Sequence, residues 1–99
     1  MSRFHVEARR VRDAGLPFKV RRAALLSCVS RYCALAGGPP REVFSFYVAK
    51  YDLEESSLEV SDKLIEAINS LEAERNMALY RLQQFEKRRI REKTRGRRT

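Results

Sequence analysis

The residues best suited to chemistry lie at the C-terminal end of the sequence. Residues 86–99 hold eight lysines and arginines against two glutamates. Most of these cations are arginines, whose planar guanidinium groups make fork-like contacts with phosphate oxygens. No aromatic residue lies among them, so stacking on bases and sequence-specific reading are not indicated. The segment predicts binding to the phosphates of a polyanion. The alternative is a solvated tail that only adds charge.

Cations at both ends of the chain could serve the same polyanion. A helix through residues 88–95 would carry positive charge on most of its sides, which suits a crevice lined with phosphate better than a protein core. The candidate phosphate-binding residues are Arg88, Arg89, Arg91, Lys93, Arg95, Arg97 and Arg98 and, near the N-terminus, Arg9, Arg10 and Arg12.

Other reactive side chains are few. Cys28 and Cys33 are five residues apart on an expected helix, about 140° apart around its axis, so they cannot pair with each other and do not have zinc-ligand spacing. We expect two reduced, packed thiols, and we expect His5, the only imidazole, on the surface. The chain has no glycine-rich phosphate loop, metal-binding His-Glu helix or nucleophile elbow. It is expected not to be an enzyme, and to bind no metal or cofactor directly.

Size and composition limit the fold to one small domain. The chain has 99 residues, a net charge of +8 at pH 7 and a hydrophobic content of 43%, which is too apolar for a wholly disordered chain. No apolar run approaches the ~20 residues that cross a bilayer, so no membrane span is expected. The charge is sorted along the chain, with +5 over residues 1–22, −7 over 52–74 and +6 over 86–99. Basic ends attract phosphate or an acidic protein surface.

The N-terminal segment predicts a short basic helix. Phe4, Ala8 and Val11 recur at i, i+4 and i+7 with arginines around them. This pattern is typical of a mitochondrial import signal, and equally of a basic surface helix or arm. We assign residues 1–15 to a basic N-terminal arm.

Prolines and glycines mark the next two elements. Pro17 can open a helix because its missing N–H would have no intrahelical partner, and Gly37 with Gly38 supplies the stop. Pro40 opens a third helix that runs to Tyr51. Its run of β-branched and aromatic residues also has strand propensity, but a lone strand would have no partner in the chain.

The last expected helix is the longest. Ser56-Ser57-Leu58-Glu59 is typical of a capping box, which predicts a helix from residue 57 to about 92 and a length of roughly 54 Å. That length exceeds what the other helices can cover. The far half should therefore project, as a coiled-coil arm or as an insert into something larger. Residues 16–92 form the expected helical domain, and residues 93–99 form a basic tail.

The recurring apolar positions predict an all-α fold with one common core. In this fold a short N-terminal basic helix or arm precedes a three-helix bundle whose C-terminal helix is long and ends in the basic tail. The residues expected to pack together are Leu25, Val29, Phe44, Tyr47, Leu64, Ile68 and Leu71.

Three features suggest a family. They are Ala-Gly-Gly-Pro-Pro-Arg-Glu at 36–42, an aromatic helix ending at Lys50-Tyr51, and a helix from 58 onward that runs from acidic to basic. This layout resembles the mitochondrial LYR-motif family, and within it the divergent branch that includes an ATP-synthase assembly factor. The resemblance covers roughly residues 20–92. The family's Leu-Tyr-Arg would fall where this chain has residues 24–26, Ala-Leu-Leu, and a literal Leu-Tyr-Arg lies at 79–81.

The resemblance implies a partner. Family members bind acyl carrier protein, whose acyl-phosphopantetheine chain enters between the helices. The carrier's recognition surface is acidic, so the residues expected to contact it are Arg21, Arg22, Arg31 and Arg41.

Together these features predict a non-catalytic helical scaffold or assembly protein in the mitochondrial matrix. We expect it to belong to the mitochondrial ribosome or its assembly intermediates, with its basic ends on rRNA phosphate and its body against neighbouring proteins. The alternative is an accessory subunit or assembly factor of ATP synthase or a respiratory complex. A coiled-coil RNA-associated protein outside mitochondria is a third possibility.

Overall fold

Four helices make up the part of the chain that the structure describes. The structure is a computed structural model, and it describes the backbone of residues 3–96 and the side chains of residues 3–86. Within these residues there is no strand, and the all-α fold class is confirmed. The helices are α1 (Arg3–Arg12), α2 (Phe18–Ala36), α3 (Pro40–Tyr51) and α4 (Val60–Gly96).

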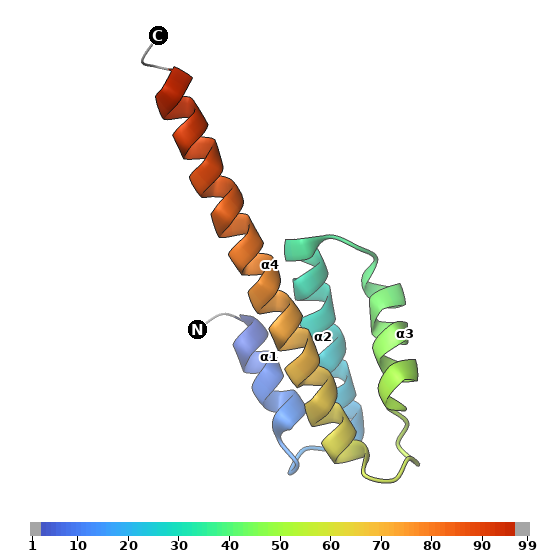
Figure 1. Cartoon of the computed structure of the whole chain (residues 1–99). Coiled ribbons are helices and arrows are strands. Elements are labelled where there is room, and N and C mark those ends of the chain that lie inside the picture. The colour runs from blue at the N-terminus through green and yellow to red at the C-terminus, as the bar shows by residue number, and fades with distance from the viewer. Residues whose placement is uncertain (1–2, 97–99) are drawn as a thin grey trace.

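The helices form a small bundle with one helix that projects far beyond it (Figure 1). α2 and α4 run side by side in the same direction, and α1 packs against both in the opposite direction. α3 covers the other side of α2. The molecule measures 65 × 26 × 16 Å, because α4 extends well past the ends of α1 and α2.

α2 and α3 begin and end close to the prolines and glycines that predicted their ends. α2 starts one residue after Pro17, whose carbonyl oxygen accepts hydrogen bonds from the amides of Val20 and Arg21. It ends where Gly37 and Gly38 adopt φ values of 88° and 106°, which suit residues without a Cβ. α3 begins with Pro40 at its first position, and the segment with strand propensity is helical.

The start of α4 differs from the capping-box prediction. The helix begins at Val60, and Glu59 has a positive φ of 57°, so it does not lie within the first turn. In the same loop the Ser57 hydroxyl donates to the Asp52 carboxylate at 2.8 Å. Asp52 has a left-handed conformation and ends α3, and the next residue, Leu53, is fully buried. Burial of Leu53 holds the loop against the core, and α4 starts three residues later than the capping box predicts.

The core contains all seven residues expected from the periodicity, which confirms that prediction. It also contains residues that the sequence placed elsewhere or did not single out. Three come from α1, namely Phe4, Ala8 and Val11, and one from the α3–α4 loop, Leu53. The core therefore joins all four helices rather than the last three.

Of the two alternatives for the N-terminal segment, the structure has the short basic helix, and α1 packs against the bundle. Phe4 is only 2% exposed, and the Arg75 guanidinium lies over its ring, 4.6 Å from the centroid. Arg12 donates to Asn69 at 2.9 Å and pairs with Glu72 at 3.4 Å. A ten-residue helix is marginal in water on its own, so these contacts with α4 and α2 are what stabilise it.

Replacing Phe4 with alanine should therefore destabilise the whole protein. We expect Phe4→Ala to lower the free energy of unfolding by about 3–5 kcal/mol, the usual range for a buried phenylalanine, in urea-induced unfolding followed by circular dichroism. Val6→Ala is the matched control, since Val6 lies on the same helix but is exposed. A loss below about 0.5 kcal/mol for Phe4→Ala would restore the arm interpretation.

Candidate nucleic-acid and protein interfaces

The candidate phosphate-binding residues of the tail belong to the far end of the chain. The backbone of α4 continues as a helix through the positions of Arg88, Arg89, Arg91, Lys93 and Arg95, away from the bundle (Figure 1). The side chains of these five residues lie outside the described set, and Arg97 and Arg98 lie outside the described residues altogether.

The three N-terminal candidates lie on α1 and differ in their accessibility. Arg9 and Arg10 are exposed, and Arg10 pairs with Glu7 at 3.2 Å one turn earlier. Arg12 is half-buried and holds Asn69 and Glu72 of α4. Arg9 and Arg10 are therefore available to a polyanion, whereas the main contacts of Arg12 are internal.

Arg21 is not a surface contact, which corrects its assignment to the acyl carrier protein. The residue is 4% exposed and lies between α1, α2 and α4. Its Nε donates to the Val11 carbonyl at 2.8 Å, and its terminal nitrogens donate to the hydroxyl and the carbonyl of Ser61 at 2.8 and 3.4 Å. Burial lowers the pKa of this guanidinium, and the carboxylate of Asp13 acts in the opposite direction.

The other three expected carrier contacts are all exposed. Arg22 and Arg31 are nine residues apart on α2, which places them on opposite sides of the helix. The Arg22 guanidinium lies over the Phe44 ring of α3, 4.9 Å from its centroid. Arg31 lies toward α1 and α4, beside Arg75, and Arg41 is exposed at the start of α3.

The described charges are polarised along the molecule. The α3–α4 loop and the first turns of α4 carry a cluster of exposed carboxylates at one end of the bundle: Asp52, Glu54, Glu55, Glu59, Asp62 and Glu66. α4 leaves the bundle at the other end (Figure 1), where its sequence becomes rich in Lys and Arg. The Ser57 hydroxyl, followed by Lys63, holds the pKa of Asp52 below its usual value, which favours the ionised carboxylate of that residue.

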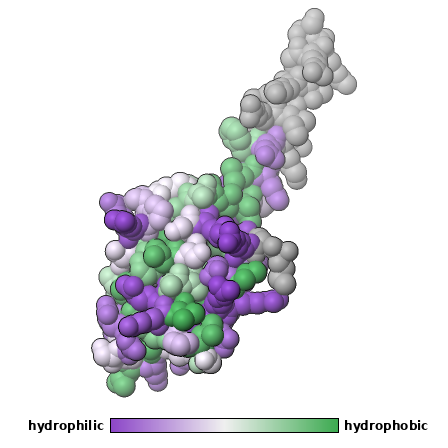
Figure 2. All heavy atoms as spheres, turned by 180° about the vertical axis from the view of Figure 1, so that it is seen from behind, coloured by the Kyte–Doolittle hydropathy of each residue, from purple (hydrophilic) through white to green (hydrophobic). Residues whose placement is uncertain are grey.

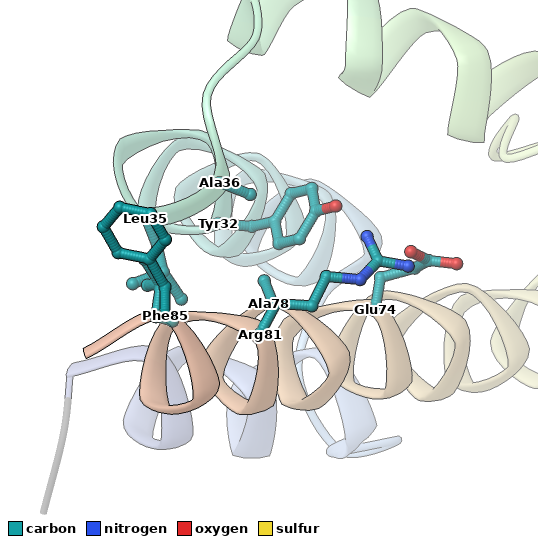
Figure 3. Close-up of a pocket in the computed structure, with 8 residues that line it drawn as sticks. Tyr32, Leu35, Ala36, Glu74, Ala78, Arg81 and Phe85 are labelled. Atoms are coloured by element: carbon teal, nitrogen blue, oxygen red, sulfur yellow. The ribbon is translucent and has the colours of Figure 1, made fainter. Parts of the chain in front are cut away.

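A groove lies where α2 ends against α4, and we call it the Phe85 groove. It has a volume of about 410 Å³ and joins the last two turns of α2 to the base of the projecting part of α4. In Figure 3 Arg81 points along α4 toward Glu74, with Tyr32 opposite, and Phe85 lies at the other end of the groove beside Leu35. The lining residues are Tyr32, Leu35, Ala36, Glu74, Ala78, Arg81, Leu82 and Phe85.

A second groove lies on the other side of Leu35, between α1, α2 and α4. This Leu79 groove has a volume of about 350 Å³, and three arginines contribute to its walls. The lining residues are Arg3, Phe4, Arg31, Ala34, Leu35, Arg75 and Leu79. Figure 2 shows hydrophobic surface at the point where α4 leaves the bundle, with hydrophilic residues around it.

These grooves were not anticipated from the sequence. The relevant signal was present, since the apolar spacing of α4 continues to Phe85 while α2 has only 19 residues to cover it. The sequence does not show which residues of α4 lie beside the C-terminal end of α2. The structure places Ala36 beside Ala78 and Leu82.

The two cysteines are packed thiols, as expected. Both are free and buried, and the Cys28 thiol lies 3.7 Å from the Phe4 carbonyl. Burial, followed by the nearby Glu7 carboxylate, raises the pKa of Cys28 to about 12, and burial also raises the pKa of Cys33.

Among the described residues no cluster of His, Cys, Asp and Glu could hold a metal ion. None of the described helices has both the length and the apolar character needed to cross a bilayer.

The buried position of Arg21 predicts a structural role. Arg21→Ala should lower the free energy of unfolding by about 2–4 kcal/mol, because the Val11 carbonyl and Ser61 would lose a charged donor in a buried site. Arg31→Ala, at an exposed position of the same helix, should change stability by less than about 0.5 kcal/mol. Urea unfolding of both variants provides the measurement. Equal free energies of unfolding for Arg21→Ala and Arg31→Ala would contradict the buried, structural role of Arg21.

The raised pKa of Cys28 predicts an unreactive thiol. Near pH 8 only about one molecule in 10⁴ would carry the thiolate in the folded state, against roughly a quarter for a free cysteine, so alkylation should be about 10³-fold slower. The measurement is the rate of iodoacetamide labelling in a Cys33→Ser background, with the same chain in urea as the control. Labelling at the same rate in both conditions would contradict the buried assignment.

No family model, curated protein or solved structure matches this chain. The resemblance to the LYR-motif family therefore stays a prediction from the sequence. The same holds for the acyl carrier protein and the acyl-phosphopantetheine that the resemblance implies.

Proposed function

We propose that this protein is a non-catalytic helical scaffold or assembly protein of a large ribonucleoprotein complex, most directly the mitochondrial ribosome or its assembly intermediates. The bundle formed by α1, α2, α3 and the first half of α4 is its docking body. The far part of α4 and the residues after it enter the complex and contact rRNA phosphate.

The observation that carries this proposal is the direction of α4. The helix leaves the bundle at the end opposite the acidic cluster, and its sequence beyond Phe85 holds eight cations and two acids. A helix that does not fold back on its own bundle and has this charge is well placed to enter a phosphate-lined crevice. The acidic end would then face away from the RNA, because like charges repel.

α1 adds a second, weaker set of cations. Arg9 and Arg10 are exposed on the outer side of the bundle, while the apolar side of the same helix is buried. These two residues lie on the last turn of α1, which is nearer to the acidic end of the bundle, so they are a minor basic region separate from the end of α4. The basic amphipathic character of this segment also supports a mitochondrial location.

Removal of the basic end tests the proposal. Deleting residues 87–99 takes away eight cations and one acid, and it leaves the described core untouched. We expect the melting temperature to stay nearly unchanged, while the affinity for a structured RNA falls steeply. The log–log dependence of affinity on salt should lose about 0.7–0.9 for each phosphate contact removed. Fluorescence anisotropy with labelled RNA at several salt concentrations measures both effects.

A charge-matched variant separates the site from the overall charge. The triple substitution Lys19→Glu, Arg41→Glu and Lys50→Glu reverses three exposed cations and so lowers the net charge by six, close to the seven lost by the deletion. It should leave most of the RNA affinity. Unchanged RNA binding after the deletion, with loss of a protein partner instead, would favour an accessory subunit of ATP synthase or a respiratory complex.

A further inference from the structure

The apolar seam of α4 continues beyond the helices that cover it. Its residues follow one another at alternating spacings of four and three, as in a helix that packs against another helix. They become exposed as α2 comes to its end: Leu71 is fully buried, Leu82 is 43% exposed and Phe85 is 63% exposed. In order, the seam consists of Leu64, Ile68, Leu71, Arg75, Ala78, Leu82 and Phe85.

The exposed part of the seam borders both grooves. Leu82 and Phe85 form one wall of the Phe85 groove, and Tyr32 and Leu35 of α2 form the other. Leu35 also borders the Leu79 groove, so the two hollows make one continuous surface at the end of α2. A contiguous apolar surface of this kind on a helix is typical of a protein contact site.

We propose that the Phe85 groove binds an acidic amphipathic helix from a separate protein chain. The occupant is a helix because the seam has helix-packing spacing and lacks a partner only past Ala36, where α2 stops. A bound helix would continue along α4 in the position that α2 would have taken if it were longer. Its apolar side chains would lie between Leu82, Phe85 and Leu35.

The acidic character of the partner follows from the charges around the grooves. Four arginines, Arg3, Arg31, Arg75 and Arg81, line the two hollows against the single carboxylate of Glu74. The sequence after Phe85 adds eight further Lys and Arg and two Glu over residues 86–99. A helix with glutamates beside its apolar stripe would be attracted to this surface, and a basic one would be repelled.

A second copy of this chain does not meet the requirement. Two projecting halves of α4 would place one basic segment against another, which is unfavourable. The acidic half of a second copy has the right charge, but its seam is already covered, since Leu64, Ile68 and Leu71 are fully buried in its own bundle. The partner is therefore a different polypeptide. This inference does not depend on RNA binding by the residues after 86.

A designed peptide tests the groove directly. The probe is a three-heptad helix with leucines at the packing positions and glutamates beside them, added to the isotope-labelled full-length chain. We expect amide chemical shift changes centred on residues 32–36 and 78–85. Phe85→Ala and Leu82→Ala should each weaken binding by about tenfold. Tyr80→Ala is the matched control, since Tyr80 is 59% exposed but lies on the opposite side of α4, and it should bind normally.

Two control peptides and one RNA decide between the alternatives. The same helix with lysines in place of glutamates should not bind, and a scrambled peptide of equal charge should lose the Phe85 dependence. Equal binding by the lysine or scrambled peptide, or normal binding by Phe85→Ala, would overturn the proposal. The proposal would also fail if an RNA oligonucleotide changed the chemical shifts of the same groove amides. It would fail as well if sedimentation showed that the protein is a dimer and that Phe85→Ala converts it to a monomer. The deletion of residues 87–99 should abolish RNA binding but not peptide binding. That result would support the RNA proposal and the peptide proposal independently.

Discussion

A helix can be covered only as far as its partners reach, and α4 has 37 residues while α2, α3 and α1 have 19, 12 and 10. At 1.5 Å per residue, α4 is about 55 Å long. The bundle can therefore bury its first half and no more. This mismatch of lengths produces the main features of the molecule: a core at one end, a groove where the cover stops, and a projecting segment whose end holds eight of the 21 Lys and Arg of the chain.

The small bundle needs more than apolar contact to hold three elements together. Arg21 provides polar contacts to two helices. It donates to the Val11 carbonyl at the end of α1 and to Ser61 in the first turn of α4. A guanidinium has several donors in a fixed plane, so one side chain of α2 can satisfy polar groups on two neighbours at once. Arg12 forms a second link between α1 and α4 at Asn69 and Glu72. Together the two arginines fix how α1 and α4 sit against α2.

Much of the fold was predictable because its signals are local. Pro17, Gly37 and Pro40 act on their own backbone, and their effects do not depend on distant residues. The capping box failed because Glu59 has a positive φ and α4 begins only at Val60, after a loop that is held to the core by the buried Leu53. The path of that loop is set by tertiary structure and cannot be seen in a four-residue pattern.

The site was harder to anticipate for related reasons. An amphipathic segment such as α1 has the same periodicity whether its apolar side faces a core or a partner, so its packing was not determined by the pattern. Arg21 and Arg22 are adjacent in sequence, but one is buried and the other exposed. The difference lies in Ser61, forty residues away, which no local pattern indicates. The groove depends in the same way on where α2 stops along α4.

The position of α1 in the core also sets a time order for the growing chain. Its partners on α4, Asn69 and Glu72, are synthesised about sixty residues after Arg12, which corresponds to roughly 3–12 s at usual rates of translation. During that interval the side of α1 that carries Phe4, Ala8 and Val11 has no α4 to pack against. Completion of the fold then buries this side of α1, so the N-terminal helix reaches its final environment only after most of the chain has been made.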